Sequence, residues 1–331
     1  MTRRPEFELI ATLFAPLARS CPGALSLMDD AALVSPSPGH ELVVTTDTLI
    51  AGVHFLDDDP PGQVAQKALR VNLSDLAAKG ARPIGVLQAL TLGDKTDDTF
   101  LESYARGFAD DLRHFNIPLL GGDTTSAPPG GPLVITITAL GELPHGTALL
   151  RGGAQPGDLL CVSGTIGDAA LGLRALRDQL PPASETHRTE LVRRYRVPEP
   201  RLALGQALRG IATACLDISD GLCADVGHIC TVSRVSAEIV WRTIPISQAA
   251  QRRLSDDPSE RSLILGGGDD YELAFTVPPA YRTRLSELAE QTATPIAVIG
   301  RVTGRDGKCD VRVMGDDGRE IVVPAGGYVH H

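Results

Sequence analysis

The sequence predicts a two-domain α/β protein, and three observations support that prediction. The chain has 331 residues, about twice the length of a typical domain. Segments with strand and helix patterns alternate from end to end, as in α/β or α+β proteins. The stretch RGGAQPGD (151–158) has three glycines and one proline between two strand-like segments, so we expect the domain boundary there.

Hydrophobic periodicity and β-branched residues define the elements of the first half. The strand 42–50 is rich in Val and Thr, and the helix 63–80 ends at Gly80, a residue type that commonly closes helices. The other elements predicted there are strands at 84–92, 117–122 and 133–143 and a helix at 97–115. An amphipathic helix is predicted at the N-terminus from apolar residues on one side: Phe7, Ile10, Phe14 and Leu17.

In the second half, an apolar run predicts a strand at 159–164 that leads into a helix. A further helix is expected after Asp220, because the pair Asp220-Gly221 separates an apolar strand from an apolar helical pattern. The remaining predicted elements are helices at 200–209 and 280–291 and strands at 271–277 and 295–302.

Composition indicates a globular protein, with 43% hydrophobic and 22% charged residues. The net charge of −10 makes nucleic acids and anionic membranes poor partners. The chain has no apolar run of about 18 residues and no convincing signal peptide, so a cytoplasmic location is expected. The six cysteines lack metal-site spacing and are expected to be free thiols.

The strand 42–50 has an oxygen-rich motif, Thr45-Thr46-Asp47. Side chains alternate along a strand, so Thr45 and Asp47 point to one face and Thr46 to the other. A hydroxyl and a carboxylate on one face suit Mg²⁺. The alternative is a threonine-rich edge strand with a solvated aspartate.

A second acidic motif spans 217–221. Asp217 and Ser219 are expected to share a face, with Ile218 in the core and Asp220 at a turn permitted by glycine. The alternative role for Asp220 is to cap the following helix, which would leave the other two polar residues unexplained.

Three further acidic sites each have a structural alternative. Asp75 is expected in mid-helix, where a surface pair with Lys79 would explain it. The motif at 121–124 (GGDT) could bring backbone N–H groups and a carboxylate to an anion and its cation, or could be a plain loop. The segment 266–272 (GGGDDYE) has three glycines and three acidic residues before a strand. Ordering such a flexible loop costs chain entropy unless the loop contacts something, so a functional role and a structural role are equally open.

Together and in order, these motifs resemble the thiamine-monophosphate kinase family. The chain has no Walker P-loop, no protein-kinase catalytic loop, no G-x-S-x-G and no H-E-x-x-H. The motifs that carry the resemblance, from about residue 25 to Tyr328, are Asp29-Asp30-Ala31-Ala32, TTDTLIAGVHF (45–55), KALRVNLSDLAAKGA (67–81), GGDT (121–124), DISDGL (217–222) and GGDDYELAF (267–275).

The resemblance implies the fold shared with aminoimidazole-ribotide synthetase and selenophosphate synthetase. The N-terminal domain, 1–148, would bind ATP and Mg²⁺ and form a β-barrel with its twin in a homodimer. The C-terminal α/β domain, 149–331, would close the active-site cleft.

The resemblance also implies a set of ligands. The Mg²⁺ ligands would be Asp30, Thr45, Thr46, Asp47, Asp75, Asp123, Asp217 and Asp220. Contacts to ATP would come from Gly122, Asp123, Arg151 and Ser219, and contacts to thiamine monophosphate from His54, Asp269 and Tyr328. No catalytic general base is expected, because the acceptor is already an anionic phosphate oxygen. We therefore expect direct in-line transfer of the γ-phosphoryl group.

Three residues depart from the family pattern. Met28 replaces the usual glycine before the aspartate pair, which puts a special backbone angle there in doubt. Lys79 replaces a residue that is more often neutral and could compete with a cation near Asp75. Asp269 is one methylene shorter than the usual glutamate, so its contact with substrate could pass through water.

Two other functions stay open at this point. A sister synthetase would use ATP to activate an amide or a selenium donor. Selenophosphate synthetases need a reactive cysteine or selenocysteine near the N-terminus, and Cys21 is followed by Pro22 and lacks a glycine-rich catalytic loop around it. A regulator or maturation factor that binds nucleotide and Mg²⁺ without turnover would lack the substrate contacts named above. A turnover assay distinguishes these classes from a kinase.

Overall fold

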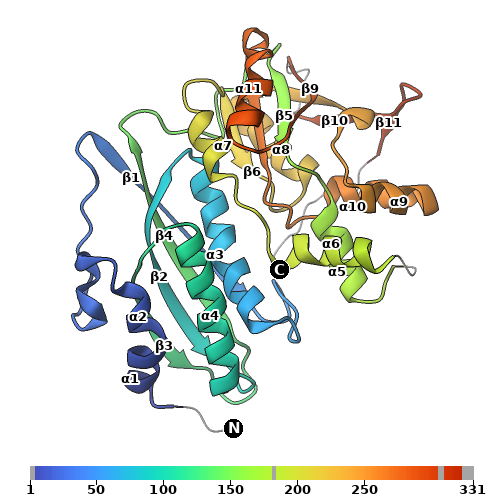
Figure 1. Ribbon diagram of the computed structural model, residues 1–331. Coiled ribbons are helices and arrows are strands. Elements are labelled where there is room, and N and C mark those ends of the chain that lie inside the picture. The colour runs from blue at the N-terminus through green and yellow to red at the C-terminus, as the bar shows by residue number, and fades with distance from the viewer. Residues whose placement is uncertain (1–3, 181–183, 305–308, 323–331) are drawn as a thin grey trace. The chain divides into compact units, whose positions relative to one another are not determined.

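The computed structural model describes residues 4–180, 184–304 and 309–322 (Figure 1). The chain divides into two compact units, each built around its own mixed sheet with helices. The first unit comprises residues 1–76 and 82–145, and the second comprises residues 77–81 and 146–331. The predicted two-domain α/β class is confirmed.

The first unit contains a four-stranded sheet in the order β1-β4-β2-β3. Strands β2 and β3 are parallel, and β4 pairs antiparallel with both β1 and β2. The elements are α1 (Glu6–Leu9), α2 (Ala15–Ala18), β1 (His40–Ile50), α3 (Pro61–Ala78), β2 (Arg82–Leu92), α4 (Asp98–His114), β3 (Leu119–Ser126) and β4 (Val134–Pro144). The strands and helices predicted between residues 42 and 143 are confirmed, although β3 extends four residues further.

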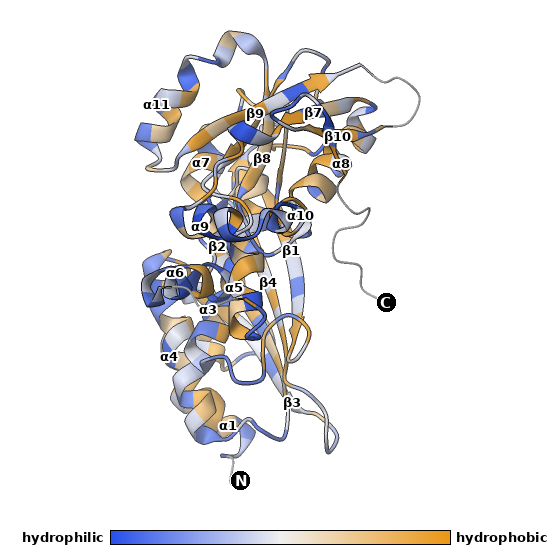
Figure 2. Cartoon of the chain, turned by 90° about the vertical axis from the view of Figure 1, so that its right-hand side faces the viewer, coloured by the Kyte–Doolittle hydropathy of each residue, from blue (hydrophilic) through white to orange (hydrophobic). Residues whose placement is uncertain are grey.

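Helices α3 and α4 cover one face of this sheet (Figures 1 and 2). Apolar residues on that face are buried, as Leu90, Ile135 and Ile137 illustrate. Burial along β1 alternates with a period of two, and its outward positions are exposed. Leu42 and Val44 are 43% and 62% exposed on this open face. A strand with one buried and one exposed face accounts for that alternation.

The N-terminal helix is only partly as predicted. Helices α1 and α2 are separated by a π-helical turn over Ile10–Phe14, which changes the sides to which the apolar residues point. Phe14 is buried, but Phe7 is 82% exposed, and Leu9 takes the buried position instead. The predicted common face of Phe7 and Phe14 is therefore wrong.

The second unit contains a seven-stranded sheet in the order β11-β10-β7-β9-β5-β8-β6. Only β7 and β10 are parallel neighbours. The strands are β5 (Leu159–Ser163), β6 (Ala214–Asp217), β7 (Ser236–Val240), β8 (Leu273–Val277), β9 (Ile296–Thr303), β10 (Val311–Met314) and β11 (Glu320–Ile321). The helices are α5 (Asp168–Leu176), α6 (Glu185–Arg196), α7 (Leu202–Ala207), α8 (Leu222–Ser233), α9 (Gln248–Asp256), α10 (Arg261–Gly266) and α11 (Arg284–Gln291).

Both faces of the central strands of this sheet are buried. In β5, Leu160 and Val162 belong to the hydrophobic core that α5, α8, α9 and α10 complete, whereas Cys161 belongs to the core that α7 and α11 complete. Strands buried on both faces are continuously apolar, which is why β5 and β8 were readily predicted. The loop after β6 and the segment before β8 hold the acidic residues of the second unit that are described below.

Candidate functional site

The first cluster joins β1 to α3 within the first unit. Thr45 Oγ donates a hydrogen bond of 2.5 Å to Asp75 Oδ2, and the backbone N–H of Asp47 donates to Asn72 Oδ1 at 3.0 Å. The alternation predicted for β1 is thus confirmed, with Thr45 and Asp47 facing α3. Asp75 is only half-buried and contacts the strand, so it is not a plain surface residue. Asn72, which is fully buried and shares the Asp75 face of the helix, was not among the predicted ligands.

The electrostatics of this cluster suit a cation. Burial, and then the charge of Asp75, raise the pKa of Asp47 to about 6. Two carboxylates in such a half-buried place repel each other unless a positive charge lies beside them. Carboxylate and hydroxyl oxygens are the ligands that Mg²⁺ prefers. The donor set formed by Thr45, Asp47 and Asp75 therefore fits Mg²⁺.

The hydroxyl of Thr46 lies on the opposite face of the sheet from this cluster. It donates to the carbonyl oxygen of Ile137 at 3.1 Å and lies 3.0 Å from Thr138 Oγ. The sheet separates the Thr46 hydroxyl from the Thr45 hydroxyl. Its role as a Mg²⁺ ligand stays a prediction.

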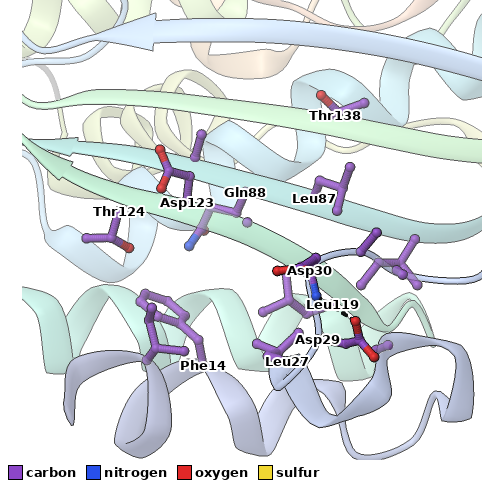
Figure 3. Close-up of a pocket in the computed structure, with 18 of the residues that line it drawn as sticks. Phe14, Leu27, Asp29, Asp30, Leu87, Gln88, Leu119, Asp123, Thr124 and Thr138 are labelled. Atoms are coloured by element: carbon purple, nitrogen blue, oxygen red, sulfur yellow. Dashed lines mark hydrogen bonds between the residues drawn. The ribbon is translucent and has the colours of Figure 1, made fainter. Parts of the chain in front are cut away.

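A pocket of about 650 Å³ opens on that other face of the sheet (Figure 3). Asp30, Gly122 and Asp123 all line it, so the structure brings Asp30 next to two predicted ligands from a distant segment of the sequence. Its walls also include apolar side chains, Phe14 and Leu27 among them. A pocket with carboxylates at one place and apolar walls at another can hold a molecule with a cation-bound phosphate and an apolar ring.

Gly122 is explained by packing. A Cβ at this position would lie 1.9 Å from the carbonyl oxygen of Gln88 on the neighbouring strand, so only glycine permits β2 and β3 to pair here. Met28, which precedes the aspartate pair Asp29-Asp30, has an ordinary backbone conformation with φ −110°. The left-handed conformations instead occur at Leu25, Ser26 and Leu27.

The third cluster is the loop after β6 in the second unit. Asp217 and Ile218 are buried, while Ser219 and Asp220 are partly exposed. Gly221, with φ 119°, is the residue that precedes α8, so the alternative role of Asp220 as the helix cap is wrong. The loop N–H groups are bound by the carboxylate of Asp225, which the sequence analysis missed.

Asp225 lies in the first turn of α8 and is 3% exposed. Its Oδ2 accepts hydrogen bonds from the backbone N–H groups of Ser219, Asp220 and Gly221 at 3.0, 2.9 and 3.1 Å. Burial raises the pKa of Asp225 to about 7 against the lowering effect of these bonds. The sequence signal was an acidic residue in a first helical turn directly after an acidic loop.

In the acidic segment 266–272, two acidic residues are buried in structural contacts and one is partly exposed. Asp270 accepts hydrogen bonds from the N–H groups of Gly167 and Ala169, at 2.6 and 3.2 Å. Glu272 is fully buried and binds two arginines, Arg194 and Arg201. Asp269 is the one acidic residue of the three that is partly exposed, and its φ is 72°.

The other predicted substrate and nucleotide contacts are on loops. The Nδ1 of His54 accepts the N–H of Ile50 at 3.1 Å, which leaves its proton on Nε2. The Nζ of the buried Lys67 donates to the carbonyl oxygen of His54 at 3.0 Å. Arg151 is exposed, and Tyr328 lies outside the described residues.

All six cysteines are free thiols, as predicted. Among the helices that the structure describes, none combines the length and the apolar character needed to cross a membrane.

Known proteins resemble this chain over nearly its whole length. Residues 28–143 match the N-terminal domain, and residues 155–311 the C-terminal domain, of the AIR synthase related protein family. A thiamine-monophosphate kinase from Caulobacter vibrioides is 43% identical over 305 residues, which cover 91% of this chain and 85% of that protein. The crystal structure of thiamine-monophosphate kinase from Stenotrophomonas maltophilia K279a has 39% identity and a TM-score of 0.82, and the match covers 94% of this chain and 98% of that one. The structure of AaThiL complexed with AMPPCP and TMP has 30% identity and a TM-score of 0.75, with 99% of each chain covered.

Proposed function

The chain belongs to the thiamine-monophosphate kinase family of AIR synthase-related proteins, and from that premise we propose roles for its site residues. The protein phosphorylates thiamine monophosphate with ATP and so forms thiamine diphosphate. The observation that best supports a metal-assisted mechanism is the pairing of Asp47 with Asp75 beside the Thr45 hydroxyl.

We propose that Mg²⁺ is held in each unit by its own aspartates. The proposed ligands in the first unit are Asp30, Thr45, Thr46, Asp47, Asp75 and Asp123, and those in the second are Asp217 and Asp220. When bound, Mg²⁺ would neutralise the phosphate charges of both substrates and the charge that develops during transfer. The aspartates would hold the positive charge of Mg²⁺ at fixed positions, which avoids reorganisation during the reaction.

The γ-phosphoryl group of ATP would pass directly to the phosphate oxygen of thiamine monophosphate. The P–O bond to the β-phosphate breaks as the bond to the acceptor oxygen forms, and ADP leaves. The acceptor is already anionic, so no side chain has to remove a proton. Catalysis then rests on orientation, for which Gly122, Asp123, Arg151 and Ser219 would bind ATP. The pocket beside Asp123 supports this assignment, because it offers apolar walls next to carboxylates.

His54, Asp269 and Tyr328 would contact thiamine monophosphate. The tautomer of His54 supports such a contact, since its Nε2–H can donate a hydrogen bond to a phosphate oxygen while Nδ1 is held by Ile50. A neutral donor of this kind contributes to binding more than to chemistry.

We expect the His54→Ala variant to raise the KM for thiamine monophosphate about tenfold while kcat falls less than threefold, because a lost hydrogen bond to a charged group is worth about 1.5 kcal/mol. Steady-state kinetics at saturating ATP measure both constants. His145→Ala, a change at an exposed histidine of the same unit, is the control and should alter neither. A tenfold fall in kcat at unchanged KM would instead give His54 a role in the transition state.

A turnover assay tests the function itself. Purified protein, ATP, Mg²⁺ and thiamine monophosphate are incubated, and thiamine diphosphate is followed by chromatography. Product should form from the monophosphate, should disappear with EDTA, and should not form from unphosphorylated thiamine. ATP binding without any product would contradict the kinase assignment and favour a synthetase or a non-catalytic regulator.

We further propose that two copies pair through the open face of the first sheet and complete a β-barrel. The exposed residues Leu42 and Val44 support this, since an apolar sheet face of this kind favours burial against a partner. The domain 1–148 would thus bind nucleotide and Mg²⁺ and dimerise, and the domain 149–331 would complete the active site. The six thiols and the need for ATP favour action in the cytoplasm.

Val44→Glu tests the dimer. A charge at this 62% exposed position would be buried in the proposed interface without a partner, so the variant should elute as a monomer. Light scattering after gel filtration gives the mass. Phe7→Glu places the same charge at an 82% exposed residue outside the sheet and should leave the dimer intact. A dimeric Val44→Glu protein would place the interface elsewhere.

A further inference from the structure

Asp225 is a buried carboxylate whose hydrogen bonds all serve one loop. Three consecutive backbone N–H groups, from Ser219 to Gly221, converge on its Oδ2 at 2.9–3.1 Å. Bonds from N–H groups to a carboxylate are among the stronger hydrogen bonds in proteins. The loop is also confined by close packing of Gly221 against Gly266. A Cβ on Gly221 would lie 2.7 Å from the backbone of Gly266.

A second loop rests on the first. The N–H of Asp269 donates to the carbonyl oxygen of Ser219 at 2.9 Å, and the N–H of Tyr271 donates to that of Ile218 at 2.8 Å. Gly268 fits against the first loop only because it has no side chain, since a Cβ on Gly268 would lie 2.2 Å from the carbonyl oxygen of Ser219. The position of Asp269 therefore depends on the backbone of the loop that Asp225 holds.

We propose that Asp225 is a positioning residue that fixes the loop Ser219–Gly221 and, through it, the loop that carries Asp269. The inference rests on the proposed roles of Ser219 and Asp220 toward ATP and Mg²⁺ and of Asp269 toward thiamine monophosphate. One buried side chain then sets the geometry of a nucleotide-binding loop and a substrate-binding loop together. Replacement of this carboxylate weakens the binding of both substrates.

The loops can be observed directly by hydrogen–deuterium exchange of the metal-free protein, without any assumption about catalysis. In Asp225→Asn, the amides of 219–221 should exchange about tenfold faster or more, because a neutral side chain binds three N–H groups less strongly. The amides of Asp269 and Tyr271, which bond to this loop, should also exchange faster. Asp158→Asn is the matched control: Asp158 is also buried in the second unit and accepts a backbone N–H from Gln155 and the Thr213 hydroxyl. It should leave exchange at 219–221 and 269–271 unchanged.

Kinetics form the second arm of the experiment. Asp225→Asn should raise the KM for ATP and the KM for thiamine monophosphate together, each by about five- to tenfold, and Asp158→Asn should raise neither. A rise in one KM alone would overturn the coupling between the loops.

Asp225 could instead bind a cation directly, since ligand atoms of Asp220, Asp225 and His228 lie within 4.8 Å of one another. Unchanged exchange in the metal-free variant would overturn the positioning role and leave direct cation binding as the alternative. Faster exchange with both KM values unchanged would keep the structural link but contradict the proposed roles of the two loops. The failure of this inference and the failure of the proposed function thus give different results.

Discussion

The Asp75→Asn variant is expected to lower kcat by about a hundredfold or more, which corresponds to about 2.7 kcal/mol of lost transition-state stabilisation. Asparagine has the same shape and can still accept the 2.5 Å hydrogen bond from Thr45. What it removes is the negative charge that, with Asp47, would hold a cation against the transferring phosphoryl group. Kinetics at saturating ATP, Mg²⁺ and thiamine monophosphate measure the loss.

The stability of the same variant should move in the opposite direction. The charge of Asp75 helps to raise the pKa of Asp47, so its removal relieves repulsion in the metal-free protein. Thermal unfolding in EDTA should therefore occur at an equal or higher temperature than in the original protein. Asp110→Asn, an exposed change on α4, is the control and should alter neither kcat nor stability by much. A loss in kcat of less than tenfold would argue against a metal-binding role for Asp75.

Glu272→Gln is expected to produce the largest loss of stability, about 3–5 kcal/mol in the free energy of unfolding. Glu272 is fully buried, and its carboxylate binds Arg194 at 2.7 Å, Arg201 at 2.7 Å and the Ser163 hydroxyl at 2.5 Å. Glutamine keeps the volume but removes the negative charge that both largely buried guanidinium groups share, so that Arg194 keeps the more distant Asp168, at 3.9 Å, and Arg201 loses its ion pair. Urea unfolding followed by circular dichroism measures the difference. Glu238→Gln is the control, because it breaks the more exposed ion pair between Glu238 and Arg301. It should lower the free energy of unfolding by about 1 kcal/mol or less.

The effect of Glu272→Gln should depend on pH. Burial alone would raise the pKa of Glu272, but Arg201, Arg194 and Ser163 outweigh it and hold that pKa below its ordinary value of 4.5. A carboxylate whose pKa is lower in the folded state stabilises the protein above the unfolded pKa, and this contribution is lost as the pH falls through the folded pKa. The difference in the free energy of unfolding between the original protein and Glu272→Gln should have its full size at pH 7 and shrink below about pH 4.5. A difference that stayed constant down to pH 3 would show that shape, not charge, is responsible.

Local patterns were enough to predict most of the regular elements. The β-branched run of β1 and the apolar runs of β5 and β8 predicted their strands, because side chains in those strands face a core with fixed periodicity. Helix α6 was missed, since its twelve residues, ETHRTELVRRYR, look like a solvated segment. Its Arg194 is buried beside Glu272, 78 residues later, and Asp168, whose charges offset its own.

The sequence by itself determined which oxygen-bearing residues the chain has, their order, and the two faces of β1, and its motifs indicated the family. The tertiary structure decided which of those residues meet. Thr45 and Asp75 are 30 residues apart and come into contact because α3 packs on β1. In the segment 266–272, two acids point inward to N–H groups and arginines and one stays partly exposed, a division that no local pattern indicates. The physical reason is that a carboxylate's role depends on the charges and donors around it, and these come from distant parts of the chain.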